Sequence, residues 1–161
     1  MFVMDILEFA INMEIEGNKY YMEQAEANKD NGLYKVFIML AEDENKHADI
    51  IKHKKEGGKY SSAKVEKTKA DTIFEDKDQK VSEITLSPEQ VDAYRFALDK
   101  EQESIDLYTE LKSKSKGDEE MFDFLIEEET KHFNLLSEVV ELLTHAKQWV
   151  ESAEFGVREE Y

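Results

Sequence analysis

The sequence has 161 residues, of which 37% are charged and 40% apolar, and its formal net charge is −17. This length is typical of one domain with a single core, and so negative a surface argues against nucleic acid or anionic membranes as partners. The sequence contains no cysteine, which excludes disulfides, iron–sulfur clusters, thiolate catalysis and a four-cysteine iron site within it. It has only one proline and six glycines, which indicates long helices.

The first predicted helix begins near the N-terminus. The stretch MFVMDILEFA is apolar, but Asp5 and Glu8 interrupt it, so we interpret it as the first turns of a helix and not as a signal peptide. No apolar run approaches the length of a membrane span, so we expect a soluble, cytoplasmic protein. Alternating spacings of three and four residues, typical of a helix, relate Val3, Leu7, Ala10, Glu14, Gly17 and Tyr21.

A second helix is predicted after the short break DNG at 30–32, which makes the two helices an antiparallel hairpin. Gly57 and Gly58 should end this helix behind a basic last turn, which suits the negative end of the helix dipole. The residues that share one face of this helix, which we call its stripe, are Leu33, Phe37, Leu40, Glu44, His47 and Ile51.

A long connection is predicted over residues 57–86, which contain no long periodic stretch. About thirty residues are enough to cross the length of a bundle. The lysine-rich part from Lys52 to Lys69 alternates with acidic and small polar residues, so we expect a solvated connector. The alternative is a docking site for an acidic electron donor.

The third helix has a clear predicted start in LSPEQ, where Ser87 is the N-cap, Pro88 the first helical residue and Gln90 the partner in a capping box. The break KGD at 116–118 separates it from a fourth helix, again as a hairpin. The third stripe is Tyr94, Ala97, Glu101, Ser104, Tyr108 and Leu111. The fourth is Phe122, Leu125, Glu129, His132, Leu136, Val139, Leu143 and Ala146.

The two halves repeat the same polar residues at the same spacings. The repeated pairs are Glu14 and Tyr21, Glu101 and Tyr108, Glu44 and His47, and Glu129 and His132. Two helical hairpins joined by a crossover at about 57–86 predict an all-α four-helix bundle with pseudo-twofold symmetry over residues 1–146. The tail 147–161 could add a short helix that buries Trp149 and Phe155, or serve an interface.

Six polar residues occupy stripe positions that otherwise hold apolar side chains, so they should converge in the core. Burying bare carboxylates costs several kcal/mol each, so such a group must bind cations or take up protons. Two divalent metals would balance four carboxylates, and Glu-x-x-His places both side chains on one helix face. The predicted metal ligands are Glu14, Glu44, His47, Glu101, Glu129 and His132.

Not every acidic residue or histidine belongs to this group, because a single Glu-x-x-His match is weak evidence. His53 and His145 lack the glutamate three residues earlier, and we interpret them as ordinary side chains near helix ends. The acidic neighbours that fall off the stripes are expected to be solvated: Glu16, Glu42, Asp43, Glu127 and Glu128. A polar structural layer is the alternative to a metal site.

Tyr21 and Tyr108 lie two turns from Glu14 and Glu101 on the same helix faces. They are either plain aromatic core residues or hydroxyl donors that orient a metal-bound carboxylate from outside the ligand set. We expect no catalytic side chain beyond the metal ligands, because a metal pair itself positions the oxidant.

These motifs together resemble the ferritin-like di-iron carboxylate superfamily, and most closely its rubrerythrin branch, over about residues 1–146. The resemblance implies that Glu44 and Glu129 bridge two irons and that Glu14 and Glu101 are the more terminal ligands. It also implies that each iron takes one histidine, His47 or His132. The chemistry implied is oxidation of a di-ferrous centre by hydrogen peroxide or dioxygen.

The sequence departs from rubrerythrins at two points. Without cysteine it has no rubredoxin module, so a peroxidase cycle would need a separate donor such as a rubredoxin-like protein. Ser104 stands where rubrerythrins carry an extra carboxylate, so the redox-linked iron shift towards that carboxylate is not implied here.

Three functions follow from this pattern. The leading one is a rubrerythrin-like non-haem di-iron oxidoreductase, a peroxidase or ferroxidase in oxidative-stress defence. The alternatives are a non-catalytic iron-binding, storage or sensing protein, and a structural bundle holding manganese, zinc or only protons. The resemblance also implies a homodimer, and the long crossover would let two chains exchange helix pairs.

Overall fold

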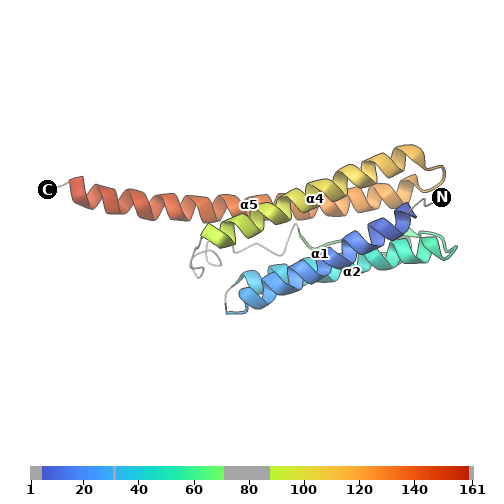
Figure 1. Ribbon diagram of the computed structural model, residues 1–161, viewed down its shortest axis with the longest axis horizontal. Helices are drawn as coiled ribbons and strands as arrows, with labels where there is room; N and C mark the ends of the chain where they lie inside the picture. The colour runs from blue at the N-terminus through green and yellow to red at the C-terminus, as the bar shows by residue number, and fades with distance from the viewer. Residues whose placement is uncertain (1–4, 31, 71–87, 160–161) are drawn as a thin grey trace.

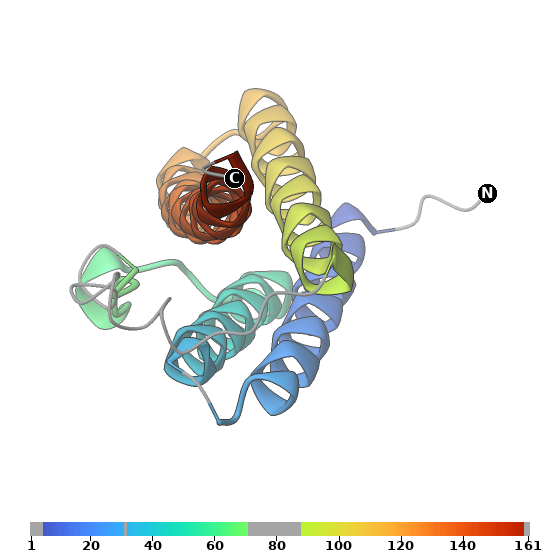
Figure 2. The same cartoon turned by 90° about the vertical axis from the view of Figure 1, so that its left-hand side faces the viewer.

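The computed structural model describes residues 5–30, 32–70 and 88–159. The helices are α1 (Ile6–Ala27), α2 (Leu33–Lys55), α4 (Pro88–Lys114) and α5 (Glu119–Glu159), with a short 3₁₀ turn, η1 (Ser62–Lys64), after α2. Helices α1 and α2 form one antiparallel hairpin and α4 and α5 form another (Figure 1). Seen from the end, α1 lies beside α4 and α2 beside α5 (Figure 2). The predicted all-α four-helix bundle is confirmed.

The helix ends follow the local sequence signals. Asp5 caps α1, because its side chain accepts a hydrogen bond of 3.0 Å from the backbone N–H of Leu7. Gly57, two residues beyond α2, has a φ of +91°, and Gly117, just before α5, has a φ of +96°; L side chains rarely adopt these values. Helix α4 begins at Pro88 as predicted. Ser87 and the side chain of Gln90 lie outside what the structure describes.

Two apolar clusters fill the bundle, one towards each end. One cluster joins the second half of α1 and the first half of α2 to the first half of α4 and the middle of α5. Its buried members include Phe37, Leu40, Tyr94 and Leu136. The other joins the opposite halves, with Ile11, Ile51, Tyr108 and Leu125. Along every helix the predicted metal ligands fall between the two clusters, so a polar layer is enclosed between apolar ones.

The C-terminal segment does not form the separate short helix that the sequence suggested. Helix α5 continues without a break to Glu159, so the described part of the tail prolongs α5 and extends beyond the ends of the other helices (Figure 1). The expected burial of Trp149 and Phe155 concerns side chains outside those described. No helix in the described ranges is long and apolar enough to cross a membrane.

The described side chains of the crossover are exposed or partly exposed from residue 57 to residue 67, but the chain becomes buried at the end of its described part, as seen at Thr68 and Ala70. Lys67 and Lys69 are exposed, but Thr68 between them and Ala70 after them are buried. The expectation of a solvated connector is therefore wrong at this end, because the chain returns to the bundle and packs there. Residues 71–86 of the expected crossover lie outside the described ranges.

Candidate metal centre

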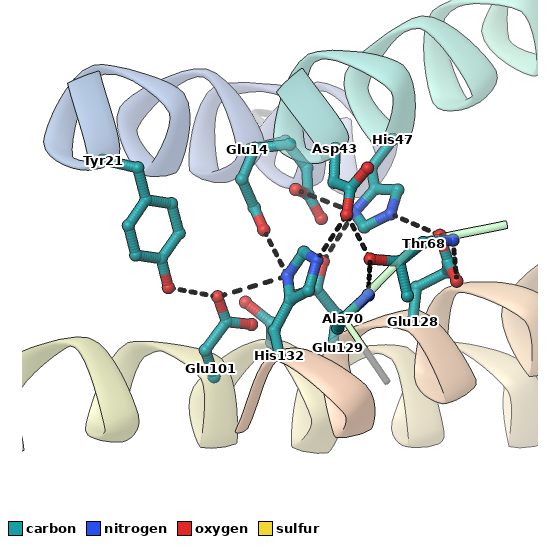
Figure 3. A network of polar contacts seen from close by, with 12 residues as sticks. Glu14, Tyr21, Asp43, His47, Thr68, Ala70, Glu101, Glu128, Glu129 and His132 are labelled. Carbon is teal, nitrogen blue, oxygen red and sulfur yellow. Dashed lines mark hydrogen bonds and ion pairs between the residues drawn. The ribbon is translucent and has the colours of Figure 1, made fainter. Parts of the chain in front are cut away.

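All four helices contribute to one buried polar cluster (Figure 3). Helix α1 contributes Glu14, α4 contributes Glu101, α2 contributes Glu44 and His47, and α5 contributes Glu129 and His132. Each of these side chains is buried, and three of them are fully inaccessible to solvent: Glu14, Glu129 and His132. The structure thus brings together all six residues that the sequence predicts as ligands.

The six residues form two overlapping groups. One group is Glu14, Glu44, His47 and Glu129, and the other is Glu44, Glu101, Glu129 and His132; within each, one ligand atom per residue lies within 4.8 Å of all the others. Glu44 and Glu129 belong to both groups. This is the arrangement that two neighbouring metal ions with two shared carboxylates require.

Both histidines present their Nδ1 atom to the shared carboxylates. His47 Nδ1 lies 2.8 Å from Oε1 of Glu129, and His132 Nδ1 lies 3.0 Å from Oε1 of Glu44. Each histidine is thus next to the shared glutamate of the opposite hairpin. The two rings are nearly parallel, with centroids 5.7 Å apart.

The donor set fits a pair of divalent metals. Among the described residues, the buried side-chain atoms without a hydrogen-bond partner are Oε2 of Glu14, Glu101 and Glu129, and Nε2 of His47. Buried carboxylate oxygens rarely remain unpaired unless an ion or a proton satisfies them. Carboxylate and imidazole ligands suit iron, manganese and zinc, so the residues themselves do not select one metal.

Without metal, protons take the place of the cations. Burial and the charges of neighbouring glutamates raise the pKa of Glu44 and of Glu129 well above the usual value. Burial alone would lower the pKa of His47 and of His132, but the surrounding carboxylates outweigh it and raise both. Burial likewise opposes ionisation of Glu14, yet its hydrogen bond with Glu44 and the charge of His47 lower its pKa to about 2.

These directions favour the protonated forms of Glu44, Glu129, His47 and His132 when no metal is bound. Metal ions would bind the same atoms, so metal binding should compete with these protons and release them.

Two acidic residues outside the predicted set adjoin the histidines, and here the sequence-based expectation is wrong. Asp43 and Glu128 were expected to be solvated, but each is only 2% exposed. Oδ2 of Asp43 lies 2.9 Å from Nε2 of His132, and Oε1 of Glu128 lies 3.5 Å from Nε2 of His47. A carboxylate on Nε2 favours the tautomer that leaves Nδ1 free to bind a metal.

A single residue of the crossover contacts both of these carboxylates (Figure 3). The hydroxyl of Thr68 donates a hydrogen bond to Asp43 Oδ2, and its backbone N–H lies 3.0 Å from each carboxylate oxygen of Glu128. The backbone N–H of Ala70 in turn donates to the hydroxyl of Thr68 at 3.2 Å. The crossover thereby holds Asp43 and Glu128, the outer carboxylates, which lie next to Nε2 of His132 and of His47.

The sequence does contain a signal for Asp43 and Glu128. Each comes directly before a shared glutamate and four residues before a histidine, so the repeated unit is an acidic residue followed by Glu-x-Lys-His. Residues four apart lie on one helix face. The spacing of four to the histidine distinguishes these two residues from the acidic neighbours Glu42 and Glu127, which lie five residues before it and are exposed.

The two tyrosines cross between the hairpins. Tyr21 on α1 donates its hydroxyl to Oε1 of Glu101 on α4, and Tyr108 on α4 donates to Oε1 of Glu14 on α1. Burial and the adjacent carboxylates raise the pKa of both phenols well above the usual value, so they remain neutral donors. Each tyrosine fixes the non-shared glutamate of the opposite hairpin.

Comparison with known proteins agrees with this geometry. The family model described as Rubrerythrin matches residues 5–140, a span that includes all six predicted ligands and both tyrosines. Searches of curated proteins and of solved structures found no match. The chain, a ferritin-like four-helix bundle with a buried carboxylate and histidine cluster, therefore belongs to the rubrerythrin family.

Proposed function

We propose that this protein is a non-haem di-iron oxidoreductase of the cytoplasm, a peroxidase or ferroxidase that acts in oxidative-stress defence. The observation that supports the proposal best is the pair of ligand groups that share Glu44 and Glu129. A ferrous pair bound there would supply two electrons, one from each ion, to hydrogen peroxide or dioxygen.

The side chains around the ligands have separate tasks in this proposal. The hydroxyls of Tyr21 and Tyr108 hold the non-shared carboxylates in place, so that each offers its free oxygen to a metal. Asp43 holds the His132 ring with Nδ1 facing the site. The apolar clusters exclude water from the two ends of the polar layer, which strengthens the electrostatic interactions within it.

Metal analysis of the protein after growth with ample iron tests the site first. We expect about two irons per chain in the wild type, as the donor set of two ligand groups implies. The double variant Glu44→Ala/Glu129→Ala should lose both irons. The matched control Glu42→Ala/Glu127→Ala removes two exposed glutamates from the same helices and should retain them. A well-folded wild type with little metal would refute the site.

Steady-state peroxide consumption separates an enzyme from a non-catalytic iron-binding or storage protein. This 161-residue sequence has no cysteine, so we propose that a separate donor such as a rubredoxin-like protein supplies the electrons. With that donor present, the proposal requires repeated turnover, whereas an iron store or sensor would be oxidised once and stop.

We also propose that the protein is a homodimer, in which the long connection between α2 and α4 would permit exchange of hairpins between chains. Light scattering tests this proposal directly. A monomer at micromolar concentration would contradict it without affecting the metal site, because all six ligands come together within one chain.

A further inference from the structure

A cavity of about 250 Å³ lies between α1 and α4 and reaches the metal ligands. Its buried end contains Glu44 and Glu101, together with Tyr21. Its outer part contains Phe96, which is 49% exposed, and the exposed Lys100. The cavity therefore connects solvent with one side of the predicted metal centre.

Small residues keep this cavity open where it meets the ligands. Gly17 is in the middle of α1, where glycine is unfavourable by about 1 kcal/mol relative to alanine. A Cβ atom at this position would lie 3.0 Å from Oε2 of Glu44. On the opposite wall Ser104 is buried, and its hydroxyl lies 3.6 Å from the sulfur of Met13. Larger side chains at either position would close the inner end.

The size of the cavity exceeds what the simplest oxidants need. Hydrogen peroxide and dioxygen have two heavy atoms each and would leave most of the space unfilled. Apolar protein cavities of about 150 Å³ hold a benzene molecule. The walls here include Met13, Tyr20 and Phe96, and the last two pack with ring centroids 5.4 Å apart. An apolar group as large as a phenyl ring is the natural occupant.

The charges around the cavity favour a neutral ligand. The two charged residues of its outer part, Glu16 and Lys100, have opposite signs. The carboxylates at the inner end are balanced once metals are bound, and the chain as a whole carries a formal net charge of −17. An organic anion is therefore disfavoured, whereas a neutral molecule with one polar end can direct that end to the metal centre.

We infer that this cavity binds the organic group of a small neutral hydroperoxide, so that the protein reduces alkyl or aryl hydroperoxides as well as hydrogen peroxide. The inference rests on the proposed function, because the two electrons come from the ferrous pair. The O–O bond breaks, two protons are taken up, and the products are one alcohol, one water and two ferric ions.

Binding can be tested apart from redox chemistry, with zinc-loaded protein and 2-phenylpropan-2-ol, the alcohol formed from cumene hydroperoxide. Methionine methyl groups labelled with ¹³C report the contact by NMR. We expect a saturable shift of the Met13 methyl signal and none of Met39, which packs against Thr68 on the crossover side. Ser104→Leu should weaken binding at least tenfold, while Ser113→Leu, an exposed position on α4, should not.

A second variant keeps the test valid if Ser104→Leu fails to fold. Phe96→Ala removes a half-exposed wall of the cavity and should weaken binding of the alcohol several-fold. Absence of a saturable Met13 shift in the well-folded wild type would overturn the inference.

Stopped-flow oxidation of iron-loaded protein then distinguishes the inference from the proposed function. We expect Ser104→Leu to slow oxidation by cumene hydroperoxide at least tenfold more than oxidation by hydrogen peroxide. If hydrogen peroxide oxidises the iron centre but cumene hydroperoxide does not, the inference is overturned and the proposed function stands. A Met13 shift with an iron centre that neither peroxide oxidises would refute the proposed function, and with it the hydroperoxide as a substrate.

Discussion

Asp43 on α2 and His132 on α5 contact each other across the two hairpins, with 2.9 Å between Oδ2 and Nε2. The equivalent pair in the other half, Glu128 and His47, is separated by 3.5 Å, and His47 Nε2 makes no hydrogen bond. The two halves of the centre are therefore related by sequence but not equal in structure. One histidine is held firmly by its outer carboxylate, and the other loosely.

This asymmetry predicts unequal effects of neutralising the outer carboxylates. Asp43→Asn removes the charge that orients His132, so metal affinity should fall by about 10- to 100-fold, as is usual for such partners of a ligating histidine. Glu128→Gln should have a smaller effect, because its contact with His47 is longer. Titration of zinc against a competing chelator measures both. The control Glu42→Gln changes an exposed neighbour and should bind as the wild type does; equal affinities in all variants would contradict the prediction.

Thr68 offers a test of how much the crossover contributes. Thr68→Val removes the hydroxyl bonded to Asp43 but retains the backbone N–H that binds Glu128. Loss of a donor to a buried carboxylate should lower the free energy of unfolding by about 1 to 3 kcal/mol. Chemical denaturation of the metal-free protein measures the change. Thr109→Val is the control, because its exposed hydroxyl bonds only within its own helix; a loss of the same size there would show that the crossover contact is unimportant.

Local signals were sufficient to predict the fold. The spacing of three and four identifies one buried stripe per helix, and caps such as Pro88 and Gly57 mark where the helices begin and end. The repeated Glu-x-x-His and its upstream glutamate then place six polar residues on those stripes, and the structure brings all six together.

The outer carboxylates were missed because a stripe analysis assumes one buried face per helix. Helices α2 and α5 are covered on two sides, by the other hairpin and by the crossover where Thr68 packs on them, so Asp43 and Glu128 become buried off the stripe. Residues 57–70 have no periodic pattern, so the position at which the crossover returns to the bundle depends on tertiary contacts that local sequence does not encode. The cavity between α1 and α4 escaped notice for the same reason.

The tyrosines give a third prediction. Tyr21→Phe and Tyr108→Phe each retain the packed ring but remove the donor to Glu101 or Glu14. We expect each change to weaken metal binding or slow oxidation by peroxide, while the helical content by circular dichroism stays unchanged. Tyr34→Phe, at a position 40% exposed, is the matched control. Wild-type affinity together with wild-type oxidation rates in both variants would reduce the two tyrosines to core aromatics.

The last prediction concerns pH and the metal-free protein. The pKa values of Glu44 and Glu129 are raised above 4.5 on folding, and those of His47 and His132 are raised above 6.5, so the folded state retains protons that the unfolded state has lost. Stability must then fall as the pH rises, with a slope of up to about 1.4 kcal/mol per pH unit for each such proton.

Glu14 acts in the opposite direction, because its pKa is lowered to about 2 on folding. Its contribution to the stability of the fold is therefore lost only in acid, as the pH falls below 4.5. We therefore expect the metal-free protein to be less stable at pH 8 than at pH 6. Zinc should reverse this order, since its binding competes with protons on the same ligands and strengthens as they leave. Thermal unfolding at both pH values, with and without zinc, measures the two trends. A metal-free protein that is as stable at pH 8 as at pH 6 would show that folding does not raise the pKa values of these groups.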